Sequence, residues 1–360
     1  MRKCLVIGND SGGLYRFRKE VFEALSSEYE LVIYSPKSSK WEELGKICET
    51  KELQIERRGR NIFHDYVLYK TIRRILKNES PDVVLTYTIK PNVYGGMACR
   101  QLKIPYLCNV TGLGTSIENG GVLSKLVLRL YRTGLRKAAC VFFQNEHNLA
   151  VFRDKEIVKG NTVLLPGSGV NTTEHSLEDY PADSEYFRFL FVGRIMKDKG
   201  VGELFQALEM LVKEGKKVLL DVVGGFDENY SEQIKNYENQ GILKYYGQQE
   251  DVHSFYATTH CLVLPSYHEG MANVLLEAAS TGRPVIASLI PGCQEAFDDG
   301  ITGFGCKAKD VISLKETMLK MYNTPWVERK EMGLRGREKV KNQFDRQIVV
   351  QAYMEQLNKI

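Results

Sequence analysis

Short runs of apolar residues alternate with longer amphipathic stretches along the whole chain. Apolar runs of about four to eight residues are typical of buried strands, whereas apolar positions three or four residues apart indicate helices. Amphipathic segments at 15–27 and 65–78 lie between the apolar runs of the first half. The strands predicted in that half are 3–8, 29–35, 81–87, 105–111 and 140–145. This alternation favours parallel βαβ units with helices on both faces of a sheet.

The same alternation starts again in the second half. Its predicted strands are 187–194, 217–225, 243–248, 261–266 and 284–288. The intervening stretch 168–186 is rich in Gly, Ser, Thr, Asn, Asp and Pro, which is typical of a linker. We therefore expect an α/β protein with two doubly wound, Rossmann-like domains, 1–170 and 186–342, facing a cleft, with ligands at the carboxyl ends of both sheets. A closing helical segment, 343–360, can cross back to the first domain.

Composition narrows the class of protein. Of the 360 residues, 43% are hydrophobic and 26% are charged, which is ordinary for a globular protein. No apolar run approaches the ~18 residues that a membrane helix needs. The eight cysteines form no C-x-x-C pair and have no His partners at zinc spacing. We expect buried free thiols in a reducing cytoplasm and no metal site.

Charge is distributed unevenly along the chain. Residues 1–160 contain 27 Lys and Arg against 17 Asp and Glu, whereas residues 161–360 contain 22 against 28. A basic first half suggests an anionic partner there. Because it contains no recognisable nucleic-acid-binding module, we do not expect that partner to be a nucleic acid.

Basic clusters in the first half occur at 56–61, 71–78 and 129–137. In the last of these, arginines recur at helical spacing beside the apolar residues Leu128, Tyr131 and Leu135; the arginines are Arg129, Arg132 and Arg136. A basic, partly apolar helix can lie on an anionic membrane surface without crossing it. The alternative is that the arginines are solvated and the leucines belong to the core. We expect a cytoplasmic protein, with peripheral binding to the inner face of the cell membrane as the hypothesis to test.

The motifs of several common enzyme classes are missing. A dinucleotide dehydrogenase needs G-x-G-x-x-G at a strand-to-helix turn. The first turn instead has Gly8, Gly12 and Gly13 at a different spacing, and "GLGTSI" at 112–117 lacks the third glycine. The chain has no P-loop, no G-x-S-x-G elbow and no H-E-x-x-H site. It also has no D-x-D triplet, which counts against metal-dependent sugar transferases.

Polar residues with a suitable chemistry follow the predicted strands of the second half. Arg194 comes at the end of the predicted strand 187–194, and Lys199 comes five residues later, in "GRIMKDKG". Two cations beside flexible glycines at the exit of a buried strand suit a diphosphate. The alternative for such a pair alone is a solvated loop.

The stretch "SYHEGMANVLLEAASTG" (266–282) contains two acids eight positions apart, Glu269 and Glu277. A helix that begins near Ala272 would leave backbone N–H groups of 270–272 directed at the strand ends, where an anion is favoured. Glu269 could accept hydroxyl hydrogens, and Glu277 could accept two ribose hydroxyls. The alternative is that Glu269 caps the helix and Glu277 forms an ion pair with a surface lysine. The donor-binding residues expected here are Glu269, Gly270, Met271, Ala272, Asn273 and Glu277.

Together these motifs resemble the retaining glycosyltransferases of the GT-B fold known as glycosyltransferase family 4, whose hallmark is E-x7-E. The resemblance covers nearly the whole chain. The matching segments are Gly12 with Gly13, Gly193 with Arg194, Lys199 with Gly200, "VVGG" (222–225), 264–288 and 292–303. The central stretch 264–288 is highly specific, whereas the glycine pair alone is a weak signal.

The resemblance implies a role for each donor-binding residue. Arg194 and Lys199 would bind the donor diphosphate, and Glu277 would bind the ribose. Glu269 would contact hydroxyls of the donor sugar. Catalysis would fall to Arg194, Lys199 and Glu269, which stabilise charge that develops on the leaving group.

The family also implies that the configuration at the anomeric carbon is retained without a metal ion or cofactor. The leaving diphosphate itself would help to deprotonate the acceptor. Gly12 and Gly13 would let the first domain approach the phosphates.

The chain departs from the family in its first half. Many relatives have a histidine near the donor sugar, but the segments 86–92 and 109–116 contain none. Lys90, Asn109 and Thr111 are available instead, and we expect them to bind the acceptor.

"TIKPN" followed by "NVTGLG" resembles the subgroup that builds capsules, O-antigens and oligosaccharides on polyprenyl diphosphate, including a transferase that adds N-acetylgalactosamine to a diphospho-undecaprenol-linked sugar. This favours a UDP-sugar over a GDP-sugar as donor and a lipid-linked sugar as acceptor. The transferred sugar can be a hexose or an N-acetylhexosamine.

Two alternative functions stay open. A GT-B UDP-sugar epimerase would need further carboxylates facing the sugar, and a catalytically silent sugar-nucleotide-binding protein would not need an intact set of donor residues.

Overall fold

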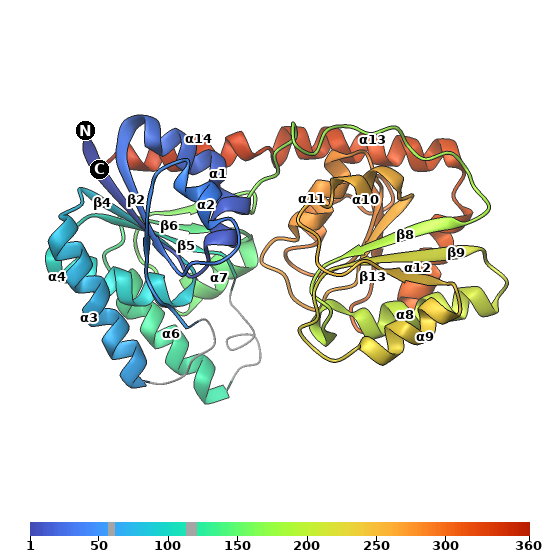
Figure 1. The fold of residues 1–360 in the computed structure, drawn as a ribbon, viewed down its shortest axis with the longest axis horizontal. Helices are drawn as coiled ribbons and strands as arrows, with labels where there is room; N and C mark the ends of the chain where they lie inside the picture. Colours follow the sequence, from blue (N-terminus) through green and yellow to red (C-terminus); the bar gives the residue numbers. More distant parts are fainter. Residues whose placement is uncertain (57–61, 113–120) are drawn as a thin grey trace. The chain divides into compact units, whose positions relative to one another are not determined.

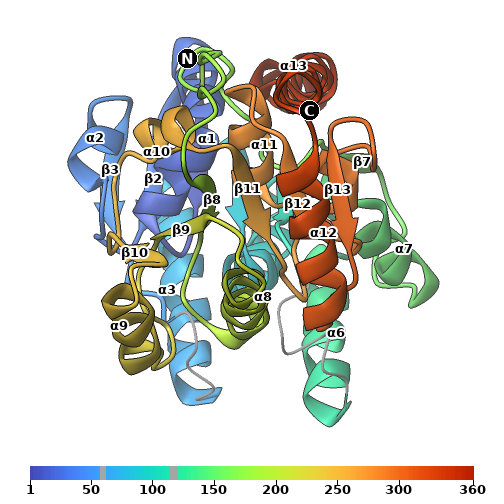
Figure 2. The ribbon, with the colours of Figure 1, turned by 90° about the vertical axis from the view of Figure 1, so that its right-hand side faces the viewer.

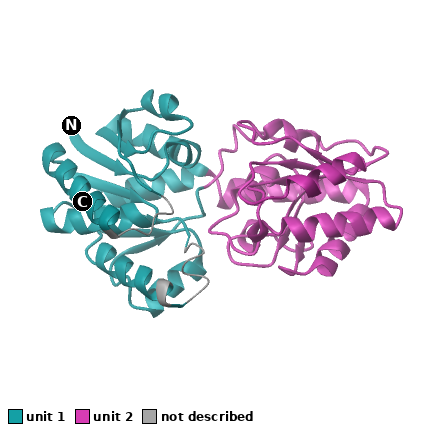
Figure 3. Ribbon diagram, turned by 60° about the horizontal axis from the view of Figure 1, so that its bottom comes forward, with its two compact units in different colours: residues 1–168, 346–360 teal, residues 169–345 magenta. Residues whose placement is uncertain are grey.

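The structure is a computed structural model that describes residues 1–56, 62–112 and 121–360. The chain forms two compact units (Figure 3). Unit 1 comprises residues 1–168 and 346–360, and unit 2 comprises residues 169–345. Each unit contains one parallel sheet.

The sheet of unit 1 has seven strands within the described residues, in the order β3-β2-β1-β4-β5-β6-β7 (Figure 1). Its strands are β1 (Arg2–Ile7), β2 (Tyr29–Ser35), β3 (Glu49–Glu52), β4 (Val83–Tyr87), β5 (Tyr106–Val110), β6 (Cys140–Phe143) and β7 (Thr162–Leu164). All neighbours pair in parallel, so that the carboxyl ends of the strands lie at one edge.

Helices cover both faces of this sheet. They are α1 (Ser11–Glu28), α2 (Trp41–Gly45), α3 (Ile62–Glu79), α4 (Gly96–Leu102), α6 (Gly121–Leu135), α7 (Glu146–Asp154) and α14 (Arg346–Leu357), with a π-helical turn at Pro91–Gly95. Alternate residues of β1 belong to different cores. Leu5 packs in one core with Ile72 of α3, whereas Val6 packs in the other with Phe22 of α1 and Tyr353 of α14. A strand that is buried on both faces reads as a continuous apolar run, as the sequence of β1 does.

Unit 2, which the structure describes throughout, has six parallel strands in the order β10-β9-β8-β11-β12-β13 (Figure 2). The strands are β8 (Phe187–Val192), β9 (Val218–Val223), β10 (Leu243–Tyr245), β11 (Cys261–Leu264), β12 (Val285–Ser288) and β13 (Gly303–Cys306). The helices are α8 (Val201–Lys213), α9 (Ser231–Asn239), α10 (His253–Thr258), α11 (Asn273–Ser280), α12 (Val311–Asn323) and α13 (Trp326–Gln343). Helix α8 packs on α12, and α11 packs on α13.

The predicted α/β class with two doubly wound sheets is confirmed. Strands β3, β7 and β13 were not expected from the hydrophobic pattern. Each of them is short and lies at the edge of its sheet, where one side of the strand lacks a neighbour and a long apolar run is not required. All eight cysteines lie in the described residues as free thiols, and all except Cys48 are buried.

Residues 169–186, which the composition indicates as a linker, pack on unit 2. The buried guanidinium of Arg283 donates to the carbonyl oxygens of Glu178 and Asp179, the latter at 2.7 Å, and its charge lies over the ring of Tyr180. Helix α13 belongs to unit 2, whereas α14 packs on α1 in unit 1. The polar stretch is therefore an ordered part of the second unit.

Candidate active site

The predicted donor residues gather at the carboxyl edge of the sheet of unit 2. Strands β8 and β11 are neighbours in that sheet, with Leu190 paired to Leu262. The segment that carries Arg194 and Lys199 follows β8, and the segment that carries Glu269 follows β11. Because parallel strands end at the same edge, the two segments come together there.

Lys199 and Glu269 form a direct ion pair. The Nζ atom of Lys199 donates to Oε1 of Glu269, and the hydroxyl of Ser266 donates to the same oxygen at 2.8 Å. Only 19% of the lysine side chain and 12% of the glutamate side chain are exposed. The two donors hold Glu269 in one orientation, which leaves Oε2 as the oxygen that neither of them occupies.

Close packing of two loops places this pair. Gly200 adopts a φ of 68°, and a Cβ atom there would collide with the carbonyl oxygen of Pro265. The backbone N–H of Tyr267 also donates to the carbonyl oxygen of Asp198 at 2.8 Å. Only glycine accepts both the left-handed φ and the close approach, which explains a glycine directly after Lys199.

Arg194 lies at the same edge but is paired differently. Its Nη1 atom is 2.7 Å from Oδ2 of Asp227, a residue in the loop after β9, and 56% of the arginine side chain is exposed. Exposed ion pairs contribute little to stability, so this guanidinium can exchange its partner. Asp227 was not among the predicted site residues.

The amino-terminal end of α11 differs from the expectation in one respect. The helix begins at Asn273, and the N–H of Ala272 donates to the carbonyl oxygen of Gly292 at 2.8 Å. This amide is therefore not available to an anion, which corrects the prediction for Ala272. Met271 is buried beside it, while Oδ1 of Asn273 is buried and has no hydrogen-bond partner among the described residues.

Glu277 accepts a hydrogen bond from a residue that the sequence did not indicate. The hydroxyl of Tyr256, on α10, donates to Oε2 of Glu277 at 2.7 Å. Tyr256 is buried, and burial together with the adjacent carboxylate raises the pKa of its hydroxyl well above the usual value. The tyrosine therefore stays protonated and acts as a donor. Its carbonyl oxygen is held in turn by Nε of Arg283 at 2.7 Å.

In unit 1, Gly12 and Gly13 form the first turn of α1. The N–H of Gly13 donates to the side chain of Asp10, the N-cap residue, at 2.9 Å. The N–H of Gly12 donates to the hydroxyl of Ser38 at 3.3 Å, and a Cβ atom at Gly12 would collide with Ser39. Glycine at position 12 therefore lets the loop after β2 pack against this turn.

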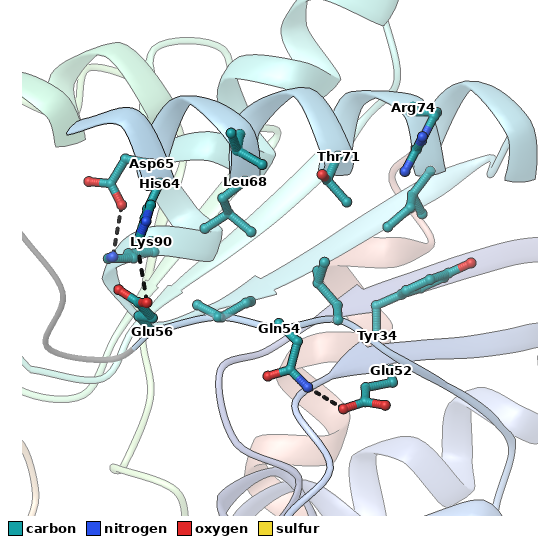
Figure 4. A pocket seen from close by; sticks show the side chains of 14 residues that line it. Tyr34, Glu52, Gln54, Glu56, His64, Asp65, Leu68, Thr71, Arg74 and Lys90 are labelled. Carbon is teal, nitrogen blue, oxygen red and sulfur yellow. Dashed lines mark hydrogen bonds and ion pairs between the residues drawn. The ribbon is translucent and has the colours of Figure 1, made fainter. Parts of the chain in front are cut away.

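The three predicted acceptor residues lie in different environments. Nζ of Lys90 forms an ion pair with Oδ1 of Asp65 at 2.7 Å at one end of a cavity (Figure 4). Thr111 follows β5 and is half-buried. Asn109 is buried within the sheet, where its amide donates to the hydroxyl of Tyr353 on α14. This corrects the assignment of Asn109 to the acceptor site. Its buried side chain forms a hydrogen bond between the sheet and α14 and does not face a ligand.

The basic helix at 129–137 also differs from the expectation. Arg129 and Arg132 on α6, and Arg136 directly after it, have exposed side chains. Leu128 is half-buried, whereas Tyr131 and Leu135 are buried in the core. Tyr131 and Leu135 therefore cannot contact a membrane together with these arginines. The cluster at 56–61 lies mostly outside the described residues.

Within the described ranges, no group of three or more His, Cys, Asp or Glu side chains is arranged to hold a metal ion. None of the described helices combines the length and the apolar character that crossing a bilayer requires.

Comparison with known families identifies both units. Residues 173–339 match the family model described as "Glycosyl transferases group 1", and residues 4–145 match the model described as "Glycosyl transferase 4-like". The chain belongs to glycosyltransferase family 4. As a glycosyltransferase it moves a sugar from a nucleotide sugar to an acceptor.

Relatives of the glycosyltransferase agree with this identification. It is 24% identical, over 98% of each chain, to the N,N'-diacetylbacillosaminyl-diphospho-undecaprenol alpha-1,3-N-acetylgalactosaminyltransferase of Campylobacter jejuni. Its fold is similar to sucrose-phosphate synthase from Thermosynechococcus elongatus, with a TM-score of 0.83, 20% identity and coverage of 99% and 98% of the two chains. It is also similar to HepE from Anabaena in complex with UDP and glucose, with a TM-score of 0.79, 16% identity and full coverage of both chains. The predicted GT-B fold is confirmed.

Proposed function

We propose that the glycosyltransferase moves a hexose or N-acetylhexosamine from a UDP-sugar to a sugar acceptor carried on polyprenyl diphosphate. The reaction retains the anomeric configuration, needs no metal ion and serves the synthesis of a cell-surface polysaccharide or glycan. The observation that carries the donor half of this proposal is the Lys199–Glu269 pair at the carboxyl edge of unit 2.

The chemistry of each side chain suits one part of a nucleotide sugar. The ammonium of Lys199 has three N–H donors, so it can hold Glu269 and a phosphate oxygen together. Arg194 can leave Asp227 and bind the diphosphate in a bidentate manner. Glu277 accepts ribose hydroxyls, and Oε2 of Glu269 accepts a hydroxyl of the donor sugar.

Charge stabilisation is the catalytic contribution of the protein. In the retaining reaction the bond from the anomeric carbon to the diphosphate oxygen breaks while the bond to the acceptor oxygen forms on the same face. The acceptor proton passes to the departing diphosphate. Arg194 and Lys199 stabilise the negative charge that develops on that group.

Two similarities support the choice of donor and acceptor. The solved structure of HepE contains UDP and glucose, and the name of the Campylobacter jejuni relative specifies transfer of N-acetylgalactosamine to a diphospho-undecaprenol-linked sugar. The same chemistry suits this chain because its first half carries the excess of basic residues.

A membrane-bound acceptor is also supported by exposed side chains of α3, the helix labelled in Figure 1. Three apolar side chains in its first turns are exposed: Phe63 by 82%, Tyr66 by 58% and Val67 by 61%. Exposed basic residues follow them on the same helix, namely Lys70, Arg73, Arg74 and Lys77. We call these seven residues the α3 surface. Apolar and aromatic side chains beside Lys and Arg favour binding to the interface of an anionic membrane.

A donor panel tests the proposal. Thermal shift is measured with UDP, GDP and several UDP-sugars, and turnover is then measured on lipid-linked sugar acceptors with and without EDTA. We expect stabilisation by UDP and UDP-sugars and transfer that EDTA leaves unchanged. Stabilisation by GDP alone would overturn the donor assignment, and a strict need for Mn²⁺ would overturn the metal-independent reaction. Release of an isomerised UDP-sugar without acceptor would instead favour an epimerase.

A further inference from the structure

Unit 1 contains a cavity of about 680 Å³ between helix α3 and the segment 52–56, which begins at the last residue of β3 (Figure 4). Helix α3 begins after β3, and Lys90 follows β4, so this end of the cavity lies at the carboxyl edge of the sheet. Ligands of open α/β sheets bind at that edge. Apart from Lys90, the sequence singled out none of the lining residues individually.

Polar side chains cluster at this end of the cavity. Nζ of Lys90 lies 2.7 Å from Oδ1 of Asp65, and Nδ1 of His64 lies 3.2 Å from Oε1 of Glu56. Each pair has one donor and one acceptor, and both pairs are drawn at the same end of the cavity in Figure 4. Donors and acceptors in alternation match a ligand with several hydroxyl groups.

The rest of the wall is largely apolar. Leu53 and Ile55 line one side, and Leu68 and Ile75 of α3 line the other. Thr71 lies between them on α3 (Figure 4). A cavity of this volume, with an apolar wall and a few polar groups, suits one or two sugar rings, which have apolar C–H faces and polar edges.

Charge argues against a phosphate inside the cavity. Three carboxylates line it, those of Glu52, Glu56 and Asp65, against the two cations Arg74 and Lys90. These carboxylates outnumber the Lys and Arg side chains, which favours a neutral polyhydroxyl ligand over an anion.

We propose that this cavity binds the sugar of the acceptor. The inference rests on the proposed function, in which the acceptor is a sugar, and adds where on unit 1 that sugar binds. Its hydroxyls contact Glu56, His64 and Asp65, and its C–H face lies against the apolar wall. Lys90 acts here by holding Asp65 in place.

The surroundings of the cavity match the remainder of a lipid-linked acceptor. Val67, Thr71 and Arg74 line both this cavity and a neighbouring basic groove. The other residues that line the groove are Tyr66, Lys70, Arg73 and Lys77. A sugar in the cavity would place its diphosphate at these cations.

Thr71→Trp tests the proposal because an indole at this half-buried position fills the cavity and spares the apolar core. The probe is N-acetylglucosamine linked through diphosphate to farnesol. Amide hydrogen exchange of segments 52–56 and 64–75 is measured with and without it, and the Michaelis constant for the probe is measured with the donor found in the panel. We expect the probe to slow exchange in the wild-type protein, and Thr71→Trp to abolish that protection and raise the Michaelis constant at least tenfold.

Asn78→Trp is the matched control, since Asn78 is exposed on the same helix and does not line the cavity. It should behave as the wild type in both measurements. Calorimetric titration with UDP should give dissociation constants within twofold for all three proteins, because UDP binds unit 2. Absence of protection in the wild type, or equal protection in Thr71→Trp, would overturn the acceptor site. If the wild-type protein does not bind UDP, that result would instead count against the proposed function.

Discussion

The hydroxyl of Tyr256 donates a hydrogen bond of 2.7 Å to Oε2 of Glu277. Tyr256 belongs to α10 and Glu277 to α11, and the tyrosine is fixed from behind by Arg283, which donates to its carbonyl oxygen. Arg283 is itself buried and also donates to carbonyl oxygens of Asp179 and Ala257. A fixed donor on one carboxylate oxygen directs the other toward a ligand. We therefore expect Tyr256 to position Glu277, the glutamate proposed to bind the ribose.

Tyr256→Phe should weaken UDP binding about tenfold, because a hydrogen bond to a charged group contributes about 1.5–3 kcal/mol and the phenyl ring keeps the packing. The lost binding free energy should come from the contact of Glu277 with the ribose hydroxyls. Binding of UDP and 2′-deoxy-UDP, measured by calorimetry, should differ less in Tyr256→Phe than in the wild type. A variant that is merely less stable, with unchanged discrimination between the two nucleotides, would contradict the positioning role.

The two acids of the E-x7-E motif should separate in their effects. Glu277→Ala should weaken UDP and UDP-sugar alike, because both contain the ribose. Glu269→Ala should leave UDP affinity nearly intact while turnover falls, because its proposed partners are hydroxyls of the donor sugar. The substitution also frees Lys199 from its ion pair, so that the lysine can still bind a phosphate. Dissociation constants and turnover numbers of both variants check this. Equal loss of UDP binding would show that the division of roles is wrong.

Removal of either cation should impair diphosphate binding. Arg194→Ala and Lys199→Ala each delete a charge-assisted contact of about 1.5–3 kcal/mol. Lys199→Ala should also lower turnover with saturating donor, because Glu269 then loses one of the two donors that orient it. Lys197→Ala, in the same loop, is the control and should keep the UDP affinity of the wild type. Wild-type affinity in both test variants would refute the assignment.

The stability of unit 2 should fall at mildly acidic pH because of His260. Nδ1 of this buried histidine accepts a hydrogen bond from the N–H of Arg188 at 3.0 Å, so the ring must be neutral. Burial lowers the pKa of His260 below its usual 6.5. Below pH 6.5 the unfolded chain therefore binds a proton at His260 more readily than the native state does. The free energy of unfolding is highest above pH 6.5 and decreases as the pH falls toward the lower pKa of the native state.

For one proton, the slope of the unfolding free energy of unit 2 against pH cannot exceed about 1.4 kcal/mol per pH unit. His260→Asn should reduce that slope, since an amide oxygen can accept from Arg188 without titrating. Denaturant unfolding between pH 7 and pH 5 measures it. An unchanged slope in the variant would exclude His260 as its source.

The α3 surface should mediate binding to anionic vesicles. Replacing Phe63 and Tyr66 together by serine should reduce co-sedimentation with vesicles that contain anionic lipid, at low salt, because both side chains are exposed. High salt should release the wild type, since screening shortens to about 3 Å at 1 M. Val327→Ser, an exposed apolar residue of unit 2, is the control and should bind as the wild type. Vesicle binding that is unaffected by the double substitution would rule out this surface.

The position of the proposed donor residues at one sheet edge could be predicted from sequence because they occur in short, local patterns. Arg194 with Lys199 and Glu269 with Glu277 each follow one buried strand, and parallel strands end at a common edge. The apolar runs of β1 and β8 likewise follow from burial on both faces of a parallel sheet. The fold class and the family motif were therefore determined by the sequence itself.

Contacts between distant segments could not be predicted in this way. Tyr256 with Glu277, Arg194 with Asp227, and the cavity between segment 52–56 and α3 join residues from different elements. Asn109 follows the same local pattern as a site residue, yet packing of α14, more than two hundred residues later, buries it. The sequence determined which side chains reach the sheet edges, because strand burial and chain direction are local. Only the tertiary structure decided which of them are paired, buried or open to a ligand, because these properties depend on how separate elements pack.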